Sequence, residues 1–258
     1  MQFKFLKLLL VTTTLFCSVF SQSALARQEF TWNQDAGDTD PTPMYGQDQG
    51  VCFLTAVQGK FEGDGESLNV YLQNRQWFLG GQSGTFGVGG KATCLAWNEI
   101  VGSYPSIYGP YTWHQRQGSS RTFLGNFDEG NGVCFLSGVS GKFAGSGEHV
   151  EITFESYSRR NWMLGGDSGK RDVSATAYCI PTSYNYTKLT DPYNWNQYKS
   201  PVYLGSGYAG CFLTGFVGNF QGSKERVALR DNYDQWYLEG NSGGGKNNIG
   251  ASARCYRK

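Results

Sequence analysis

The chain has 258 residues, with 22 Lys and Arg against 21 Asp and Glu, so its formal net charge is +1. A balance so near zero does not indicate a nucleic acid or an anionic membrane as a partner. The chain contains 36 glycines and 16% aromatic residues. Glycine-rich turns between short aromatic and β-branched runs predict an all-β fold.

The first 26 residues have the pattern of a secretory signal peptide. Lys4 and Lys7 give a positive start, residues 8–20 are apolar but too short to span a bilayer, and Ala24 and Ala26 form a small-x-small cleavage site. We expect cleavage after Ala26 and a secreted, extracellular or periplasmic protein. Removing 26 residues from 258 leaves 232, with a net charge of −1 and no segment apolar for long enough to span a membrane.

A fifteen-residue motif, which begins Cys-Phe-Leu and ends in Glu, occurs three times, at residues 52–66, 134–148 and 211–225. Each copy follows an aromatic-x-Trp-x-Gln segment, and these segments start 81 and 82 residues apart. A fixed period is typical of a repeat architecture. The mature chain therefore divides into repeat 1 (27–96), a linker (97–110), repeat 2 (111–180), a linker (181–192) and repeat 3 (193–258).

Each repeat is expected to form about five short β-strands. The third strand shows the clearest alternation of apolar and polar residues, as in Leu68, Val70 and Leu72. The fourth contains a tryptophan that we assign to the core, at Trp77, Trp162 and Trp236. Two arrangements fit: three tandem disulfide-stapled β modules, or three copies closed around a pseudo-threefold axis with one shared core. We favour separate modules that pack through their linkers.

Six cysteines remain once Cys17 is removed with the signal peptide. An even count in an exported chain indicates disulfides, and six cysteines allow fifteen pairings. Each repeat has one cysteine at its start and one at its end, so the predicted bridges are Cys52–Cys94, Cys134–Cys179 and Cys211–Cys255. No Cys-x-x-Cys or Cys/His cluster is present, and we predict neither a metal nor a cofactor.

An aromatic and an amide on one strand face could together bind a sugar, the first by stacking and the second by hydrogen bonds to hydroxyls. The first strand of each repeat offers such a pair, although the same pattern describes an ordinary strand end. The pairs are Trp32 with Gln34, Trp113 with Gln115, and Trp195 with Gln197.

Two further sets of repeated residues are candidates for ligand contacts. Apolar residues on the outward face of the fourth strand could form a binding surface or a joint between modules; they are Phe78, Met163 and Tyr237. The motif glutamates could bind a ligand or hold the glycine-rich turn shut by accepting backbone N–H bonds, and we favour the second role. They are Glu66, Glu148 and Glu225.

Catalytic chemistry has little support in the sequence. The stretch around Ser168 matches a fragment of trypsin-like serine proteases, but it is one of three variants of a repeated turn, and neither His114 nor His149 recurs in the other repeats. An acidic loop of repeat 1 contains Asp35, Asp38 and Asp40. It lacks the EF-hand spacing and the closing glutamate and does not recur in the other repeats, so we favour a solvated loop over a Ca²⁺ site. We predict no catalytic residues.

The sequence therefore predicts a secreted, non-enzymatic and multivalent binding protein, lectin-like or an adhesin, whose partners are glycans or cell-surface components. Repeated sites gain avidity against repetitive ligands. The alternative is a structural or protein-interaction protein of the cell envelope or extracellular matrix. A third hypothesis is a hydrolase whose site lies in one divergent repeat. No motif predicts an oligomeric state.

Overall fold

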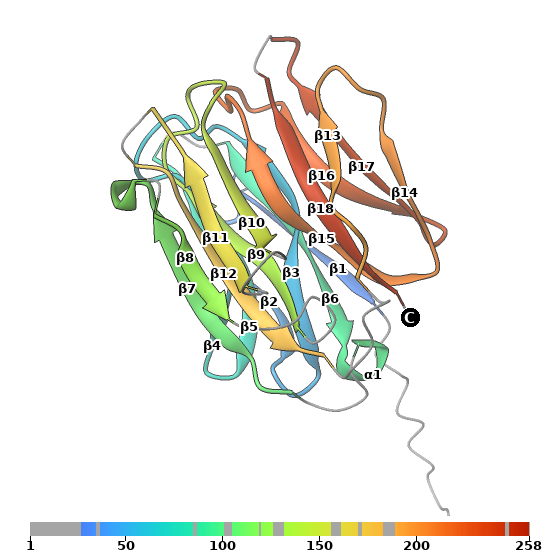
Figure 1. The fold of residues 1–258 in the computed structure, drawn as a ribbon. Coiled ribbons are helices and arrows are strands. Elements are labelled where there is room, and N and C mark those ends of the chain that lie inside the picture. The colour runs from blue at the N-terminus through green and yellow to red at the C-terminus, as the bar shows by residue number, and fades with distance from the viewer. Residues whose placement is uncertain are drawn as a thin grey trace, which may run out of the picture.

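The computed structural model describes residues 27–34, 37–84, 87–100, 105–118, 120–125, 132–155, 161–169, 172–182, 189–245 and 248–257. The predicted signal peptide lies outside these ranges. The described residues form eighteen β-strands, a four-residue α-helix, α1 (Trp97–Ile100), and a 3₁₀ turn at Gln115–Gln117 (Figure 1). The all-β prediction is confirmed, and no helix in these ranges is long and apolar enough to cross a membrane.

Each repeat contributes six strands, one more than predicted. The strands of repeat 1 are β1 (Gln28–Asn33), β2 (Thr42–Gly46), β3 (Gly50–Gly59), β4 (Ser67–Gln73), β5 (Gln76–Gln82) and β6 (Val88–Ala96). Those of repeat 2 are β7 (Tyr108–His114), β8 (Thr122–Gly125), β9 (Gly132–Ser140), β10 (His149–Glu155), β11 (Asn161–Asp167) and β12 (Ser174–Pro181). Those of repeat 3 are β13 (Tyr193–Asn196), β14 (Val202–Ser206), β15 (Tyr208–Val217), β16 (Glu225–Asn232), β17 (Gln235–Ser242) and β18 (Gly250–Arg257).

The strands that the sequence did not predict are β2, β8 and β14. Each lies between the aromatic-x-Trp-x-Gln segment and the first cysteine of its repeat, a stretch in which the sequence predicts no strand. These strands are short and their exposure does not alternate; in β2, for example, Pro43 is exposed and the next two residues are both buried. They therefore show little of the period-two pattern that predicts a strand. They become strands because each pairs with the fifth strand of its own repeat: β2 with β5, β8 with β11, and β14 with β17.

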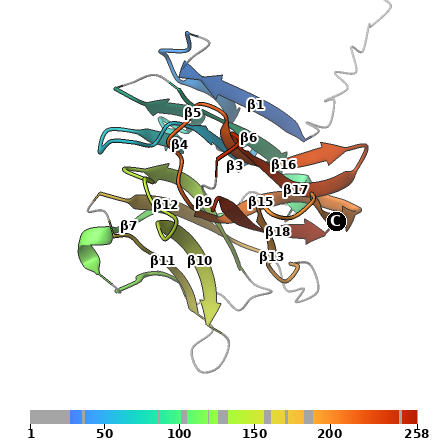
Figure 2. The same cartoon turned by 90° about the horizontal axis from the view of Figure 1, so that it is seen from above.

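The strands form three antiparallel six-stranded sheets, and each sheet combines two repeats. Sheet A has the order β1-β6-β3-β16-β17-β14, sheet B the order β2-β5-β4-β9-β12-β7, and sheet C the order β13-β18-β15-β10-β11-β8. Half of every repeat therefore lies in one sheet and half in the next. Figures 1 and 2 show the three sheets wrapped around a common interior.

The prediction of tandem separate modules is therefore wrong. Repeats join through continuous backbone pairing at three seams: β3 with β16 in sheet A, β4 with β9 in sheet B, and β10 with β15 in sheet C. A seam converts the exposed edge of one repeat into a paired strand, which removes the cost of unpaired edge N–H and C=O groups. The alternative with one shared core and approximate threefold symmetry is the arrangement that the structure adopts.

A ring of three backbone hydrogen bonds joins the repeats at the axis. The N–H of Phe61 donates to the carbonyl of Phe220 (2.7 Å), Phe143 to Phe61 (2.9 Å) and Phe220 to Phe143 (2.7 Å). The three phenylalanines are fully buried, and their rings also contact Phe216. A second triplet of edge-to-face rings lies along the same interior, formed by Phe53, Phe135 and Phe212.

The three predicted disulfides are present, each between directly paired cysteines of the third and sixth strands of a repeat. Their sequence separations are 42, 45 and 44 residues. Closing loops of this length stabilises the folded state by about 4 kcal/mol per bridge in the chain-entropy model. The bridges fit an oxidising extracellular compartment.

The first strand of each repeat packs its tryptophan against a glycine of the fifth strand, which is β5, β11 or β17. A Cβ on Gly81 would lie 2.8 Å from the ring of Trp32, and one on Gly166 would lie 2.9 Å from Trp113. These glycines are therefore required for the close approach of two sheets. The repeated Trp-x-Leu-x-Gly pattern thus has a packing cause, because its tryptophan and leucine are also buried.

We expect unfolding to be a single cooperative transition. Because half of each repeat pairs with a neighbour, an isolated repeat such as residues 111–180 leaves its seam strands unpaired and should not fold. Denaturation of residues 27–258, followed by circular dichroism and by tryptophan fluorescence, should give coincident curves. Separate transitions by the two probes, or a folded isolated repeat, would contradict the seam architecture.

Phe143→Ala should lower the free energy of unfolding by about 3–5 kcal/mol, because it removes a fully buried ring and leaves a cavity at the axis. Phe123→Ala is the matched control in the same repeat, since Phe123 is 48% exposed, and should change stability by less than about 1 kcal/mol. Urea denaturation measures both variants. Equal effects would mean that the axial cluster does not hold the repeats together.

Candidate ligand-binding groove

The outward face of each seam depends on one pair of opposed residues. The pairs are Ala228 with Ala56 in sheet A, Asn69 with Gly138 in sheet B, and Glu151 with Gly215 in sheet C. These positions correspond between repeats, because Asn69, Glu151 and Ala228 each follow their motif glutamate by three residues. The side chain at this position is thus short in sheet A and long in sheets B and C.

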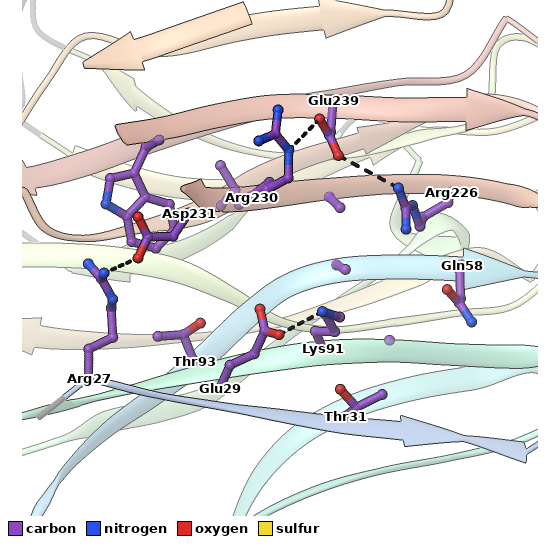
Figure 3. Close-up of a pocket in the computed structure, with 15 residues that line it drawn as sticks. Arg27, Glu29, Thr31, Gln58, Lys91, Thr93, Arg226, Arg230, Asp231 and Glu239 are labelled. Atoms are coloured by element: carbon purple, nitrogen blue, oxygen red, sulfur yellow. Dashed lines mark hydrogen bonds and ion pairs between the residues drawn. The ribbon is translucent and has the colours of Figure 1, made fainter. Parts of the chain in front are cut away.

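A groove of about 470 Å³ lies on sheet A over the two alanines (Figure 3). Short side chains along the seam form its floor, and longer polar ones form its walls. The floor includes Ala56, Gly90 and Ala228, and the walls include Arg27, Glu29, Thr31, Gln58, Lys91, Thr93, Arg226, Arg230, Asp231 and Glu239. Repeats 1 and 3 both contribute, so the groove exists only because the seam forms.

Ion pairs organise the walls of the groove. On the side of repeat 1, Lys91 Nζ lies 2.6 Å from Glu29 Oε1. On the side of repeat 3, Glu239 lies between two guanidinium groups, with Oε2 2.9 Å from Arg230 Nε and Oε1 3.7 Å from Arg226 Nη2. These pairs hold donors and acceptors at fixed positions facing the groove, as Figure 3 shows.

Arg27 connects the two walls at one end of the groove. Its guanidinium pairs with Asp231 of β16 and lies over the ring of Trp236, 4.8 Å from the centroid. Such a cation–π contact contributes about 0.5–2 kcal/mol, depending on its solvation. The N-terminal end of repeat 1 is thereby tied to repeat 3 on the outside of sheet A.

Two tyrosines and an arginine contact one another in a row across sheet A, beyond the groove wall. We call this row, Tyr203, Tyr237 and Arg230, the aromatic ladder. The rings of Tyr203 and Tyr237 are 5.4 Å apart, and the guanidinium of Arg230 lies 4.6 Å from the centroid of Tyr237. Tyr203 is 52% exposed. The ladder therefore places an accessible apolar ring face beside the hydrogen-bonding groups of the groove.

The equivalent seams of sheets B and C are more filled. In sheet B, the space above Gly138 is taken by Asn69 Oδ1 and Thr176 Oγ1, which would lie 2.1 and 2.5 Å from a Cβ there. In sheet C, a smaller groove of about 300 Å³ remains beside Glu151, whose carboxylate pairs with Arg121 at 3.1 Å. The scaffold is repeated three times, whereas the groove chemistry differs in every copy.

The tryptophans that the sequence suggested for sugar stacking lie in the core, not in this groove. Trp32, Trp113 and Trp195 are 1%, 0% and 5% exposed. The indoles of the last two donate to the carbonyls of Ser120 (2.9 Å) and Lys199 (3.1 Å). None of the three offers an open ring face to a sugar, and the stacking role that the sequence suggested for them has no geometric support.

The glutamines beside these tryptophans bind the backbone of neighbouring turns. Nε2 of Gln34 donates to the carbonyl of Ser83, and Nε2 of Gln115 to that of Ser168, both at 2.9 Å. Oε1 of Gln197 accepts the N–H of Ile249 at 3.1 Å. The amides therefore hold turns at the ends of the sheets. This is the ordinary strand-end role, which the sequence left open as the alternative to sugar binding.

Phe78, Met163 and Tyr237 are half-buried and lie on three different sheets. Phe78 stacks on Tyr71 at 5.6 Å and 21°, and burial raises the pKa of the Tyr71 phenol. They therefore do not join the repeats to one another, because the seams do so. Of the three, Tyr237 belongs to the ladder beside the groove.

The motif glutamates are buried, with 3%, 4% and 6% of Glu66, Glu148 and Glu225 exposed. The N–H of Gly63 donates to Glu66 Oε2 at 2.6 Å, and the carboxylates of the other two lie in the same position against Gly145 and Gly222. Glycine is required there, since a Cβ would meet the carboxylate at 2.4–2.7 Å. These contacts support the turn-holding role.

The protease-like stretch is part of a structural turn. Ser168 is buried and its carbonyl accepts the Gln115 amide, while the His149 ring Nδ1 lies 3.2 Å from the carbonyl of Gly147. Asp38 accepts the N–H of Asn33 at 2.8 Å, which holds its loop. Within the described residues, no group of three or more His, Cys, Asp or Glu could hold a metal ion. The absence of enzymatic activity stays a prediction.

Sequence reasoning missed every charged residue of the groove. The repeated motifs do not point to these residues, because Arg27, Arg226, Arg230 and Glu239 do not recur in the other repeats. One signal was available: β16 alternates Arg226, Ala228 and Arg230 with buried residues, where the other copies carry fewer charges. Departures from the repeat, more than the repeat itself, mark the groove.

No protein-family model, curated protein or solved structure matches the chain.

Glu66→Ala should lower the free energy of unfolding by about 1–3 kcal/mol, because it leaves the buried N–H of Gly63 without its acceptor. Glu62→Ala is the control, since Glu62 forms only a surface ion pair with Lys60, worth about 0–1 kcal/mol. Thermal unfolding of both variants tests this. A stable Glu66→Ala protein that loses ligand binding would instead assign the carboxylate to a site.

Proposed function

We propose that this protein is a secreted, non-enzymatic carbohydrate-binding protein whose main site is the groove of sheet A with its aromatic ladder. The observation that carries the proposal is that the aromatic ladder leads directly into the groove. An accessible Tyr203 ring continues through Tyr237 and Arg230 to a groove lined by paired donors and acceptors. Sugar rings present an apolar face and several hydroxyls, which match such a surface.

The ion pairs suit hydroxyl recognition for an electrostatic reason. A carboxylate such as Glu29 accepts from a sugar hydroxyl while Lys91 beside it donates to the next. Charge-assisted hydrogen bonds are about twice as strong as neutral ones. Because Glu29 and Lys91 neutralise one another, sugar hydroxyls can bind to this pair without leaving an unpaired charge.

The three-sheet scaffold favours binding over catalysis in this proposal. The groove walls lie on strands held by the seam, so the donors are positioned before a ligand arrives, which lowers the entropic cost of binding. The smaller groove of sheet C offers a second position on another face. Two grooves on one chain would raise avidity for a polymeric glycan.

Ala228→Asn tests the groove by giving sheet A the residue that repeat 1 carries at this position. The Asn side chain should fill the seam as Asn69 does in sheet B, so glycan binding should fall by about tenfold or more, the effect of losing one good hydrogen-bonding contact. Residues 27–258 should first be screened on a glycan array at high protein density, and affinities of the hits measured by calorimetry.

Asn69→Ala is the matched control, because it opens the seam of sheet B, which lacks the arginines of sheet A. It should leave the affinity unchanged. Thermal unfolding verifies that both variants fold. Failure of the wild-type chain to bind any glycan, or full affinity in a folded Ala228→Asn protein, would overturn the proposal.

A further inference from the structure

We propose that the groove of sheet A selects an acidic polysaccharide and binds its carboxylate or sulfate group between Arg226 and Gln58. This inference rests on the proposed function and names the class of its ligand. It is argued from the distribution of charge within the groove and from the register across the seam.

The groove carries more cations than anions. Its lining contains four cationic side chains, Arg27, Lys91, Arg226 and Arg230, and three carboxylates, Glu29, Asp231 and Glu239. Arg27 and Lys91 each have a carboxylate of their own. The surplus positive charge therefore lies on the wall of repeat 3, where two guanidinium groups share Glu239.

Arg226 is the less neutralised of the two. Arg230 makes the close contact with Glu239, at 2.9 Å through Nε, whereas Arg226 approaches the same carboxylate only to 3.7 Å. A separation of 3.7 Å is too long for a hydrogen bond, so Arg226 keeps its planar fork of donors for another acceptor. Its side chain is 44% exposed.

Gln58 faces Arg226 from the other repeat. The two residues are direct partners in the seam register, so their side chains leave the sheet on the same face, next to the floor formed by Ala56 and Ala228. A guanidinium and an amide over a shallow floor can donate together to the oxygens of one anionic group. Bidentate recognition of planar and tetrahedral oxyanions is the geometry that arginine supports best.

The other two sheets lack this pair. The positions of Arg226 and Gln58 correspond to Ser67 and Ser140 in sheet B, and to His149 and Val217 in sheet C. The proposed anion site is therefore single, and it belongs to the sheet whose floor is open. The accessible ring of Tyr203, at the end of the ladder beside it, provides a stacking surface for the rest of the sugar chain.

The test compares matched acidic and neutral polymers. Calorimetry should measure binding of residues 27–258 to oligogalacturonate and its methyl ester, and to dextran sulfate and dextran. We expect at least one acidic form to bind about tenfold or more tightly than its neutral partner, with an affinity that falls as salt rises. The pair that shows the difference identifies the anion as carboxylate or sulfate.

Two variants assign the effect to Arg226. Arg226→Ser, which installs the residue of repeat 1, should remove the preference for the acidic polymer, while Arg226→Lys should keep part of it because it retains charge but not the fork. Arg116→Ser is the control, since Arg116 is an exposed arginine paired with Asp172 outside the groove. It should bind as the wild type does.

Each adverse outcome has a definite meaning. Equal affinity for acidic and neutral polymers, or an unchanged preference in Arg226→Ser, overturns the anion site while the proposed glycan binding stands. Absence of binding to all four polymers and to the glycan array overturns both. Tighter binding to a DNA duplex than to either acidic polymer, lost in Arg226→Ser, would replace the polysaccharide by nucleic acid.

Discussion

The ring of backbone hydrogen bonds among Phe61, Phe143 and Phe220 is the constraint on which the rest of the structure depends. Each of these residues donates a backbone hydrogen bond to one of the other repeats and accepts one from the other. No repeat can therefore satisfy these N–H and C=O groups by itself. Buried backbone groups without partners cost free energy comparable to a lost hydrogen bond. Three repeats are therefore needed at once to complete the axis.

Closure at the axis places the motif glutamates and the seams. The carbonyl of Glu66 accepts the N–H of Gly141, and that of Glu148 accepts the N–H of Gly218, so the glycine-rich turns of repeats 1 and 2 are each fixed against the next repeat. From these turns, the following strands leave in register with the neighbouring repeat's cysteine strand. The most repeated residues of the chain thus define the scaffold, and the least repeated ones line the groove.

Net charge was a poor guide to the groove. The chain is nearly neutral because its 22 Lys and Arg almost balance its 21 Asp and Glu, yet folding brings Arg27 of repeat 1 to Asp231 of repeat 3 and leaves two guanidinium groups of one wall sharing Glu239. A local excess of one charge is set by which strands meet at a seam. The net charge is a sum over the whole chain and does not contain this information.

The sequence by itself determined the all-β class, the three repeats, the disulfide pairs and the burial of Trp77, Trp162 and Trp236, because local periodicity and spacing encode strand faces and loop closure. Only the tertiary structure decided whether a strand pairs within its repeat or across a seam. Edge strands carry the same backbone donors and acceptors whatever their side chains, so their partner depends on the closure of the whole ring. The groove, formed by residues about 170 positions apart such as Ala56 and Ala228, follows from that closure.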